Sequence, residues 1–275
     1  TWAWAEPPHI VVGNPTPLRR MADEAGLKSL DACAFVVVDE VDSFLDDDER
    51  RESLHRLLND HLPRKRSTVF ATASVDAPQR LPGDLLRRRW ATRPVEYLSS
   101  ERGMPSIQHT LVVCPKPEAR LAVLRQFLKG VQTPTVVFFD EKRLTLLPKI
   151  ASALKQDQLR VDVLNEADDL ESRSSAFEAF VSGETDVLLT TDLAARGLDA
   201  PRTALVVNFD VPRTATDYLH RAGRTARLGR NGAVLTICEK SERFALERFG
   251  NKLGVGVDEV AAGSEAYARL AGVGE

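Results

Sequence analysis

The chain has 275 residues, a hydrophobic fraction of 43% and a charged fraction of 28%, which is the balance of a folded protein with one or two domains. Its formal net charge of -3 excludes a nucleic-acid binder that acts through an overall positive field, but it allows a cleft lined by local arginines. Cys33, Cys114 and Cys238 are odd in number and far apart, which favours buried free thiols in a reducing, intracellular compartment over disulfides or a zinc site.

No apolar run approaches the roughly 20 residues that a membrane span needs, so we expect no membrane partner. The first residues, Thr1-Trp2-Ala3-Trp4, are neither an initiator methionine nor a signal peptide. We therefore expect the chain to begin inside a larger protein.

Strands and helices are expected to alternate in the first part of the chain. Apolar and β-branched runs predict strands, and amphipathic stretches predict helices. The strands are expected at Pro8–Val12, Ala34–Asp39, Ser67–Thr72 and Pro94–Leu98, and the helices at Pro17–Gly26 and Glu49–Leu62. The continuous apolar, β-branched run at Ala34–Asp39 is typical of a strand buried on both faces of a parallel sheet, and Ser67–Thr72 is expected to be the next buried strand.

Ser99 to Ser106 is polar and contains Gly103 and Pro105, so we expect a linker there. The alternation then resumes. Strands are expected at Ile107–Cys114, Thr135–Phe139, Val161–Leu164, Asp186–Thr190, Ala204–Asp210 and Ala233–Cys238. Helices are expected at Pro117–Leu128, between Phe139 and Leu154, between Leu164 and Val181, and at Thr214–Ala222, Glu242–Asn251 and Asp258–Leu270. This order predicts an α/β protein with two parallel-sheet domains in tandem, 1–98 and 107–275, of which the first is incomplete.

The segment from His220 to Arg230 contains four arginines and one histidine. If it starts a helix, Arg221, Arg224 and Arg227 follow one another at i, i+3 and i+6, and their guanidinium groups can converge. Such forks suit a polyphosphate. A solvated basic face or an RNA-contacting patch is the alternative.

Two further polar segments follow apolar strands, where ligands bind in α/β sheets. Asp39, Glu40 and Asp42 follow the first, and the second runs from Thr190 to Asp199 and contains Arg196 and Gly197. An aspartate at such a position can hold Mg²⁺, and the adjacent glutamate can polarise a water molecule. The alternatives are a solvated loop start for the first segment and a helix N-cap at Asp192 for the second.

Taken in chain order, the three segments resemble motifs of the DEAD-box RNA helicase family. The acidic segment that begins at Asp39 resembles motif II, Thr190–Asp199 resembles motif V, and His220–Arg230 resembles motif VI. The resemblance implies two RecA-like domains, ATP and Mg²⁺ as cofactors and RNA bound through its backbone. Asp39 would hold the metal ion, Glu40 would activate water, and Arg224 and Arg227 would act as arginine fingers on the γ-phosphate. His220 and Arg221 would bridge to the acidic motif from one side, and Asp42 would contact motif VI from the other.

Further roles follow from the same resemblance. Asp199 would hold the ribose, and Gly197, Arg221 and Asp42 are counted with it as nucleotide-binding residues. Thr191, Arg173 and Arg196 would face RNA.

The chain departs from the family pattern at several positions. No glycine is followed by lysine, so the P-loop is absent, and these residues alone should not bind ATP tightly or hydrolyse it. Ala71-Thr72-Ala73 replaces Ser-Ala-Thr, Asn14-Pro15-Thr16-Pro17 replaces Thr-Pro-Gly-Arg, and Leu164-Asn165-Glu166 replaces Leu-His-Gly. The last change places a carboxylate near expected RNA phosphates.

Two functions remain open at this level. The first is an ATP-dependent RNA helicase that unwinds short duplexes or remodels ribonucleoproteins. The second is an inactive pseudo-helicase that serves as a scaffold, with RNA or protein partners, in a larger assembly. An unrelated α/β binding protein would require three ordered matches to be accidental.

Overall fold

The computed structural model describes residues 8–25, 30, 32–45, 47–72, 77–91, 93–96, 98, 107–195 and 199–272. The chain divides into two compact units, Thr1–Glu101 and Arg102–Glu275, and each is described by itself. The predicted linker at 99–106 lies outside the described residues.

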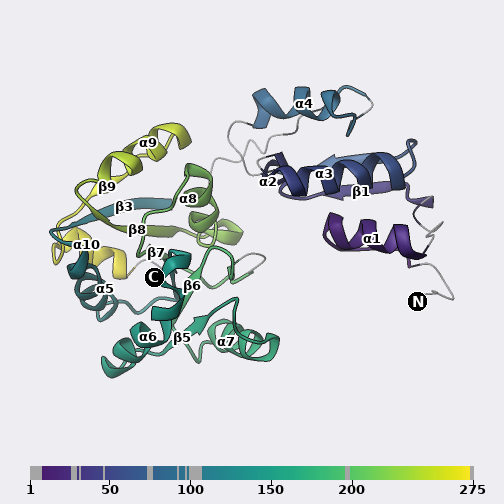
Figure 1. Cartoon of the computed structure of the whole chain (residues 1–275). Helices are drawn as coiled ribbons and strands as arrows, with labels where there is room; N and C mark the ends of the chain where they lie inside the picture. Colours follow the sequence, from purple (N-terminus) through teal and green to yellow (C-terminus); the bar gives the residue numbers. More distant parts are fainter. Residues whose placement is uncertain are drawn as a thin grey trace. The chain divides into compact units, whose positions relative to one another are not determined.

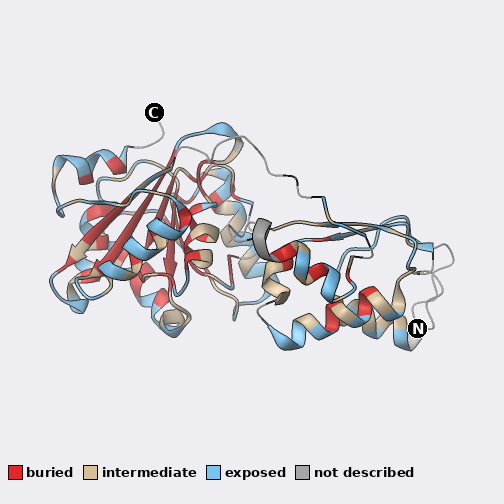
Figure 2. Ribbon diagram, turned by 90° about the horizontal axis from the view of Figure 1, so that it is seen from above, coloured by how far each residue is buried: buried red, intermediate tan, exposed pale blue. Residues whose placement is uncertain are grey.

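The second unit is built on a sheet of seven strands in the order β5-β6-β4-β7-β8-β3-β9, all paired in parallel (Figure 1). Its strands are β3 (Ile107–Cys114), β4 (Thr135–Phe139), β5 (Val161–Leu164), β6 (Val187–Thr191), β7 (Leu205–Asn208), β8 (Gly232–Glu239) and β9 (Asp258–Glu259). Every residue of β4, β6 and β7 is buried, as the unbroken apolar runs predict for strands covered on both faces (Figure 2). The expected α/β class with parallel sheets is confirmed.

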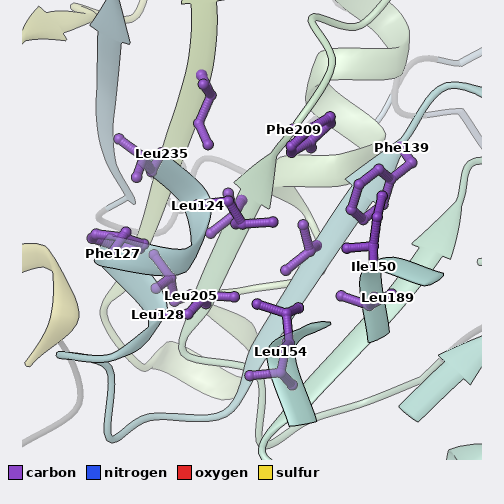
Figure 3. Close-up of a cluster of buried hydrophobic side chains, with 14 of the residues drawn as sticks. Leu124, Phe127, Leu128, Phe139, Ile150, Leu154, Leu189, Leu205, Phe209 and Leu235 are labelled. Carbon is purple, nitrogen blue, oxygen red and sulfur yellow. The ribbon is translucent and has the colours of Figure 1, made fainter. Parts of the chain in front are cut away.

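Helices cover both faces of this sheet. One core contains side chains of α5 (Arg120–Leu128), α6 (Leu147–Gln156) and α10 (Glu265–Ala271), and Figure 3 shows Leu124, Phe127 and Leu154 within it. The other core contains side chains of α7 (Leu170–Ser182), α8 (Ala215–Ala222) and α9 (Arg243–Leu253). Short 3₁₀ helices lie at Pro117–Ala119 (η3), Glu141–Leu146 (η4) and Arg227–Gly229 (η5). The second unit therefore has a complete core of its own.

The first unit contains a two-stranded parallel sheet of β1 (Phe35–Val38) and β2 (Ser67–Phe70). Its helices are α1 (Pro15–Ala25), α2 (Val41–Leu45), α3 (Asp48–Arg56), the π-helix η2 (Leu57–His61) and α4 (Ala77–Arg87). A small core joins one face of the sheet to α3, η2 and α4 through Val38, Leu54, Leu58, Leu85 and Trp90.

The expectations that β1 is buried on both faces and that β2 is a buried strand are wrong. Phe35, Val37 and Val69 are 72%, 69% and 52% exposed, because no element of the described chain packs on that face. The expected strands at Pro8–Val12 and Pro94–Leu98 are also wrong: their described residues form no strand, and Ile10 and Val12 are exposed.

The expected helix at Asp258–Leu270 is split. Asp258 and Glu259 add an edge strand to β3, and α10 starts only after Gly263, whose φ of +78° favours glycine.

Candidate nucleotide- and RNA-binding site

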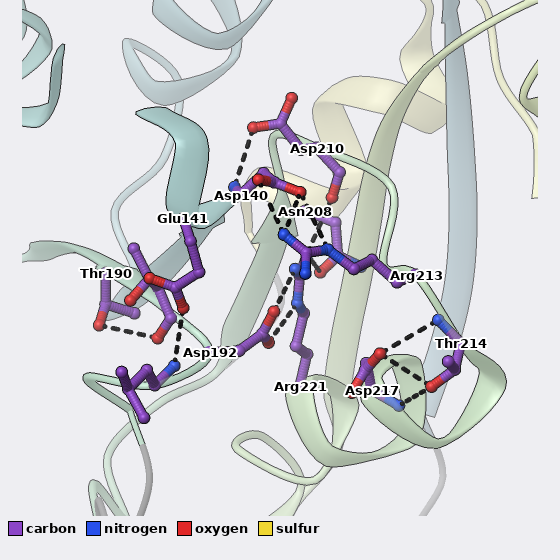
Figure 4. A network of polar contacts seen from close by, with 12 residues as sticks. Asp140, Glu141, Thr190, Asp192, Asn208, Asp210, Arg213, Thr214, Asp217 and Arg221 are labelled. Atoms are coloured by element: carbon purple, nitrogen blue, oxygen red, sulfur yellow. Dashed lines mark hydrogen bonds and ion pairs between the residues drawn. The ribbon is translucent and has the colours of Figure 1, made fainter. Parts of the chain in front are cut away.

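The carboxyl ends of the parallel strands in the second unit carry most of the polar groups expected to bind ligands. β6 ends at Thr191 and is followed by Asp192, β7 ends at Asn208 and is followed by Asp210, and α8 begins shortly after β7. A capping box fixes the start of α8: Thr214 accepts a hydrogen bond from the backbone N–H of Asp217, whose side chain accepts one from the Thr214 N–H (Figure 4).

The expected arginine spacing on one helix is wrong. α8 ends at Ala222, so Arg221 lies in its last turn, Arg224 lies in the turn that follows, and Arg227 starts η5. The chain turns away because Ala226 adopts the left-handed conformation, with φ of +56°. The three guanidinium groups are therefore held by different backbone segments.

Arg221 is 3% exposed and its guanidinium is fully engaged inside the second unit. Nε and one terminal nitrogen donate to the two carboxylate oxygens of Asp192 at 2.7 and 2.6 Å, and the other terminal nitrogen donates to Asn208 Oδ1 and to the Asp210 carbonyl (Figure 4). The same group lies over the Phe138 ring at 5.2 Å. Arg221 thus connects α8 to the ends of β6 and β7. The Asp192 carboxylate accepts hydrogen bonds from Arg221, whereas the alternative interpretation gave it the role of a helix N-cap. The predicted bridge to the acidic motif stays a prediction.

Arg227 makes a second contact between the same two segments. It donates to Asp199 Oδ1 at 2.5 Å, and its Nε donates to the Gly223 carbonyl at 2.9 Å. Asp199 is exposed, whereas Arg224, Arg227 and the neighbouring His220 are half-buried. Two Asp–Arg pairs therefore join the segment after β6 to the arginine segment. Arg196 and Gly197 lie outside the described residues.

Asp210 is a further junction that the sequence analysis did not single out. Its carboxylate accepts hydrogen bonds from Arg143 Nε, from Arg120 and from the backbone N–H of Asp140. It is nearly buried, and Arg120 also pairs with Glu239 and Glu242. Its sequence signal is an acidic residue at the end of the apolar run Ala204–Asp210, the same kind of position that marked Asp39.

Thr191 and Arg173, expected to face RNA, both lie beside Glu166. The Thr191 hydroxyl donates to Glu166 Oε2 at 2.9 Å and accepts from the Ala194 N–H at 3.3 Å. Glu141 Oε1 accepts from the Leu193 N–H at 3.1 Å. Burial and a hydrogen bond with Glu166 raise the pKa of Glu141. Burial also favours a raised pKa at Glu166, but hydrogen bonds with Glu141 and Thr191 and the charge of Arg173 outweigh it and lower the pKa of that carboxyl.

In the first unit, Asp39 and Glu40 form the turn directly after β1. The Glu40 N–H donates to Asp39 Oδ1 at 2.9 Å, and Glu40 adopts φ of +48°. Both residues are exposed. Asp42 is in the first turn of α2, and its Oδ1 is buried without a hydrogen-bond partner among the described residues.

The residues after β1 fit the chemistry of a Mg²⁺ site in which a phosphate supplies further ligands. Mg²⁺ is commonly held by one or two carboxylates plus phosphate oxygens and water, and Asp39 offers an exposed carboxylate. Among the residues that the structure describes, no group of three or more His, Cys, Asp and Glu side chains could hold a metal ion by itself. No helix in the same part of the chain is long and apolar enough to cross a membrane.

Comparisons with known proteins agree with this architecture. Residues 1–81 match the family model of the DEAD/DEAH box helicase, and residues 119–229 match that of the helicase conserved C-terminal domain. The chain belongs to the DEAD-box helicase family.

Among the relatives is the chloroplastic DEAD-box ATP-dependent RNA helicase 58 of Oryza sativa subsp. japonica, which is 32% identical over 272 residues, covering 92% of this chain and 61% of the relative. The ATP-dependent RNA helicase DRS1 of Candida albicans is 33% identical, covering 91% of this chain and 40% of the relative. The chain thus spans about three fifths of the length of the first relative and about two fifths of the length of the second.

A solved structure of S. cerevisiae Dbp5 bound to RNA and ADP BeF3 superposes with a TM-score of 0.81 at 22% identity, covering 96% of this chain and 69% of that one. The likeness confirms the expected tandem RecA-like fold.

Proposed function

We propose that these residues form part of the catalytic core of a DEAD-box RNA helicase, which couples ATP binding and hydrolysis to RNA binding and to local duplex unwinding or ribonucleoprotein remodelling. The observation that carries the proposal is the pair of Asp–Arg contacts, Asp192–Arg221 and Asp199–Arg227, which join two segments 28 and 29 residues apart at the carboxyl edge of the sheet. One contact is buried and structural, and the other contains two groups suited to a nucleotide.

The nucleotide would be shared between the two units. In the second unit, Asp199 holds the ribose, and Arg224 and Arg227 stabilise negative charge on the γ-phosphate, a contribution of roughly 10³–10⁵ in phosphoryl transfer. In the first unit, Asp39 would hold Mg²⁺, which would supply neutralising charge at the phosphates, and Glu40 would orient and polarise the attacking water. The link between the arginine segment and the acidic motif would be made by His220, Arg221 and Asp42. The nucleotide-binding residues would also include Gly197.

Asp42 Oδ1 is buried without a hydrogen-bond partner among the described residues, which is costly for a carboxylate. The family resemblance assigns Asp42 a contact with motif VI, and that role is part of the proposal.

RNA would contact the second unit through Thr191, Arg173 and Arg196, mainly at its phosphates and without reading sequence. One solved relative, Dbp5 L327V, is bound to Gle1 H337R and IP6. Protein partners within a ribonucleoprotein assembly therefore belong to the proposal. Three free cysteines, two of them buried, support a reducing compartment inside the cell.

ATP hydrolysis requires a phosphate cradle that these 275 residues do not contain. The proposal therefore needs a Gly-Lys-Ser or Gly-Lys-Thr loop supplied from outside them, and the encoded residues upstream of Thr1 are the place to look. The exposed apolar face formed by Phe35, Val37 and Val69 supports the same proposal, because further elements of a RecA-like domain would cover it.

The test is the ATPase activity of the protein expressed from its complete reading frame, measured with and without single-stranded RNA. We expect RNA to stimulate hydrolysis, and we expect Glu40→Gln to lower kcat by at least about 10² with little change in thermal stability. Glu49→Gln, a matched change at an exposed position of α3, should leave kcat unchanged. Absence of RNA stimulation in a folded protein would contradict the proposal.

A scaffold without turnover is the second candidate. Two observations favour it: the Thr191 hydroxyl, which is expected to face RNA, already donates to Glu166, and these 275 residues contain no P-loop. It predicts that Glu40→Gln has no effect on growth when it replaces the chromosomal copy. A growth defect with normal protein abundance would reject the scaffold and retain the enzyme.

A further inference from the structure

One of the groups assigned to RNA binding in the second unit, the Thr191 hydroxyl, already donates to a carboxylate of the chain itself. Thr191 is fully buried, and its only hydroxyl proton is donated to Glu166 Oε2 at 2.9 Å. A hydroxyl has one proton to donate, so Thr191 cannot also donate to a phosphate oxygen while this bond persists.

The positive charge of Arg173 lowers the pKa of Glu166, which places the two groups within electrostatic reach. The buried Nε of Arg173 has no hydrogen-bond partner among the described residues. A carboxylate that accepts from a hydroxyl and lies near an arginine has the surroundings of a bound phosphate oxygen.

The backbone holds Glu166 in this position from three neighbouring strands. Glu166 follows β5, Thr191 ends β6, and Glu141 follows β4, in a sheet whose order is β5-β6-β4. Glu141 accepts a hydrogen bond from the Leu193 N–H, so it fastens the start of the loop that follows β6.

We propose that Glu166 is an internal competitor of RNA, whose carboxylate occupies the position that a backbone phosphate takes between Thr191 and Arg173. This inference rests on the proposed RNA binding of the second unit. RNA binds here only when Glu166 swings away, so the chain binds single-stranded RNA more weakly than its donors alone would allow. The competition weakens binding to every sequence equally, because phosphates carry no base information.

The inference is tested by the affinity of the 275-residue chain for a fluorescein-labelled oligouridylate of about twelve nucleotides, a length within the range of single-strand binding sites. Fluorescence anisotropy is measured over a series of salt concentrations. Glu166→Ala should raise the affinity about tenfold, and it should steepen the slope of log K against log salt by about 0.7, the value for one additional phosphate contact on a single strand.

Glu171→Ala is the matched control. It removes the same charge from the first turn of α7, where Glu171 is exposed. Its affinity should change by less than about twofold, with an unaltered slope, because exposed charges are screened at moderate salt.

The donors are tested in the Glu166→Ala background. Adding Arg173→Met or Thr191→Val should cancel the gain, whereas Thr191→Val alone in the wild type should have little effect, because the Thr191 hydroxyl already donates to Glu166. Unfolding midpoints in urea establish that each variant is folded. If the Thr191→Val variant does not fold, the Arg173→Met variant decides the result.

Two outcomes separate the hypotheses. If the wild type binds and Glu166→Ala matches Glu171→Ala in affinity and slope, internal competition is overturned and RNA binding stands. If neither the wild type nor any folded variant binds the oligonucleotide, RNA binding by this unit is overturned, and the competition with it.

Discussion

The backbone of Glu40 adopts φ of +48°, a conformation that costs an ordinary residue roughly 1–2 kcal/mol relative to the right-handed region. The residue is exposed, so its side chain gains little from packing that could offset this cost. Strain at a polar residue that follows a strand is typical of functional sites. Its retention is consistent with the catalytic role proposed for its carboxylate.

Replacing Glu40 by glycine should therefore stabilise the first unit by about 0.5–1 kcal/mol, because relief of the left-handed strain exceeds the added entropy of the unfolded chain. Glu40→Ala is the control, since it removes the same carboxylate but retains the strain. Urea unfolding followed by tryptophan fluorescence measures both. Equal midpoints for the two variants would contradict the account.

The two Asp–Arg pairs should differ in their contribution to stability. Arg221 is 3% exposed and loses its main acceptor in Asp192→Ala, so we expect a loss of about 2–4 kcal/mol, somewhat below a fully buried pair because the Asp192 side chain is partly exposed. Asp199 is largely exposed, and Asp199→Ala should cost less than about 1 kcal/mol. Denaturant midpoints of the second unit test this difference, and a cost for Asp199→Ala as large as that for Asp192→Ala would refute it.

At the scale of helices and strands, the second unit could be predicted well from its sequence. The continuous apolar runs of β4, β6 and β7 have neighbours on both sides and helices on both faces, so the local pattern and the final burial agree. The run at Pro8–Val12 has the same composition, but it forms no strand, because a strand also needs a partner that a local pattern does not reveal.

The candidate site could be predicted only in part, for the same reason. Single residues such as Asp39 and Asp199 were marked by their position after strands. The contacts Glu166–Thr191 and Asp192–Arg221 join residues 25 and 29 positions apart that belong to different elements, and no spacing rule within one element encodes them.

Asp157 joins two helices and should make the stability of the second unit depend on pH. It lies at the end of α6 and accepts from Arg125 at 2.6 Å and from Lys129 at 3.0 Å, both on the segment of α5. The hydrogen bonds from Arg125 and Lys129 lower the pKa of Asp157 to about 2, from the ordinary value of about 3.9 in an unfolded chain.

Because the pKa of Asp157 is lower in the folded than in the unfolded chain, the stabilisation by its contacts with Arg125 and Lys129 is present above about pH 4. It is lost as the pH falls through about 2. Asp157→Asn should therefore be less stable than the wild type at pH 7, and the difference should shrink between about pH 4 and 2. Asp168→Asn, on an exposed loop, is the control with no such trend. A difference that is constant over this pH range would show that the ion pairs do not contribute.

At the scale of the whole chain, the two units differ in how completely they are built. The second has cores on both faces of a seven-stranded sheet, whereas the first has one small core and an open apolar face. The larger buried area of the second unit should make it the more resistant to denaturant. The units should then unfold in separate transitions.

The three cysteines report on this directly. Cys33 is half-buried in the first unit, and Cys114 and Cys238 belong to the cores on opposite faces of the second unit's sheet. Burial raises the pKa of both core thiols, that of Cys238 to about 12, so almost no reactive thiolate is present at neutral pH.

With an aromatic disulfide reagent, one thiol should react in the native protein, and the other two should become reactive together at the higher urea concentration that unfolds the second unit. Cys33→Ser identifies the first thiol. If Cys114 and Cys238 became reactive at different urea concentrations, the two faces of the sheet would not be one cooperative structure. If all three thiols reacted equally in the native state, the cores would not exclude the reagent.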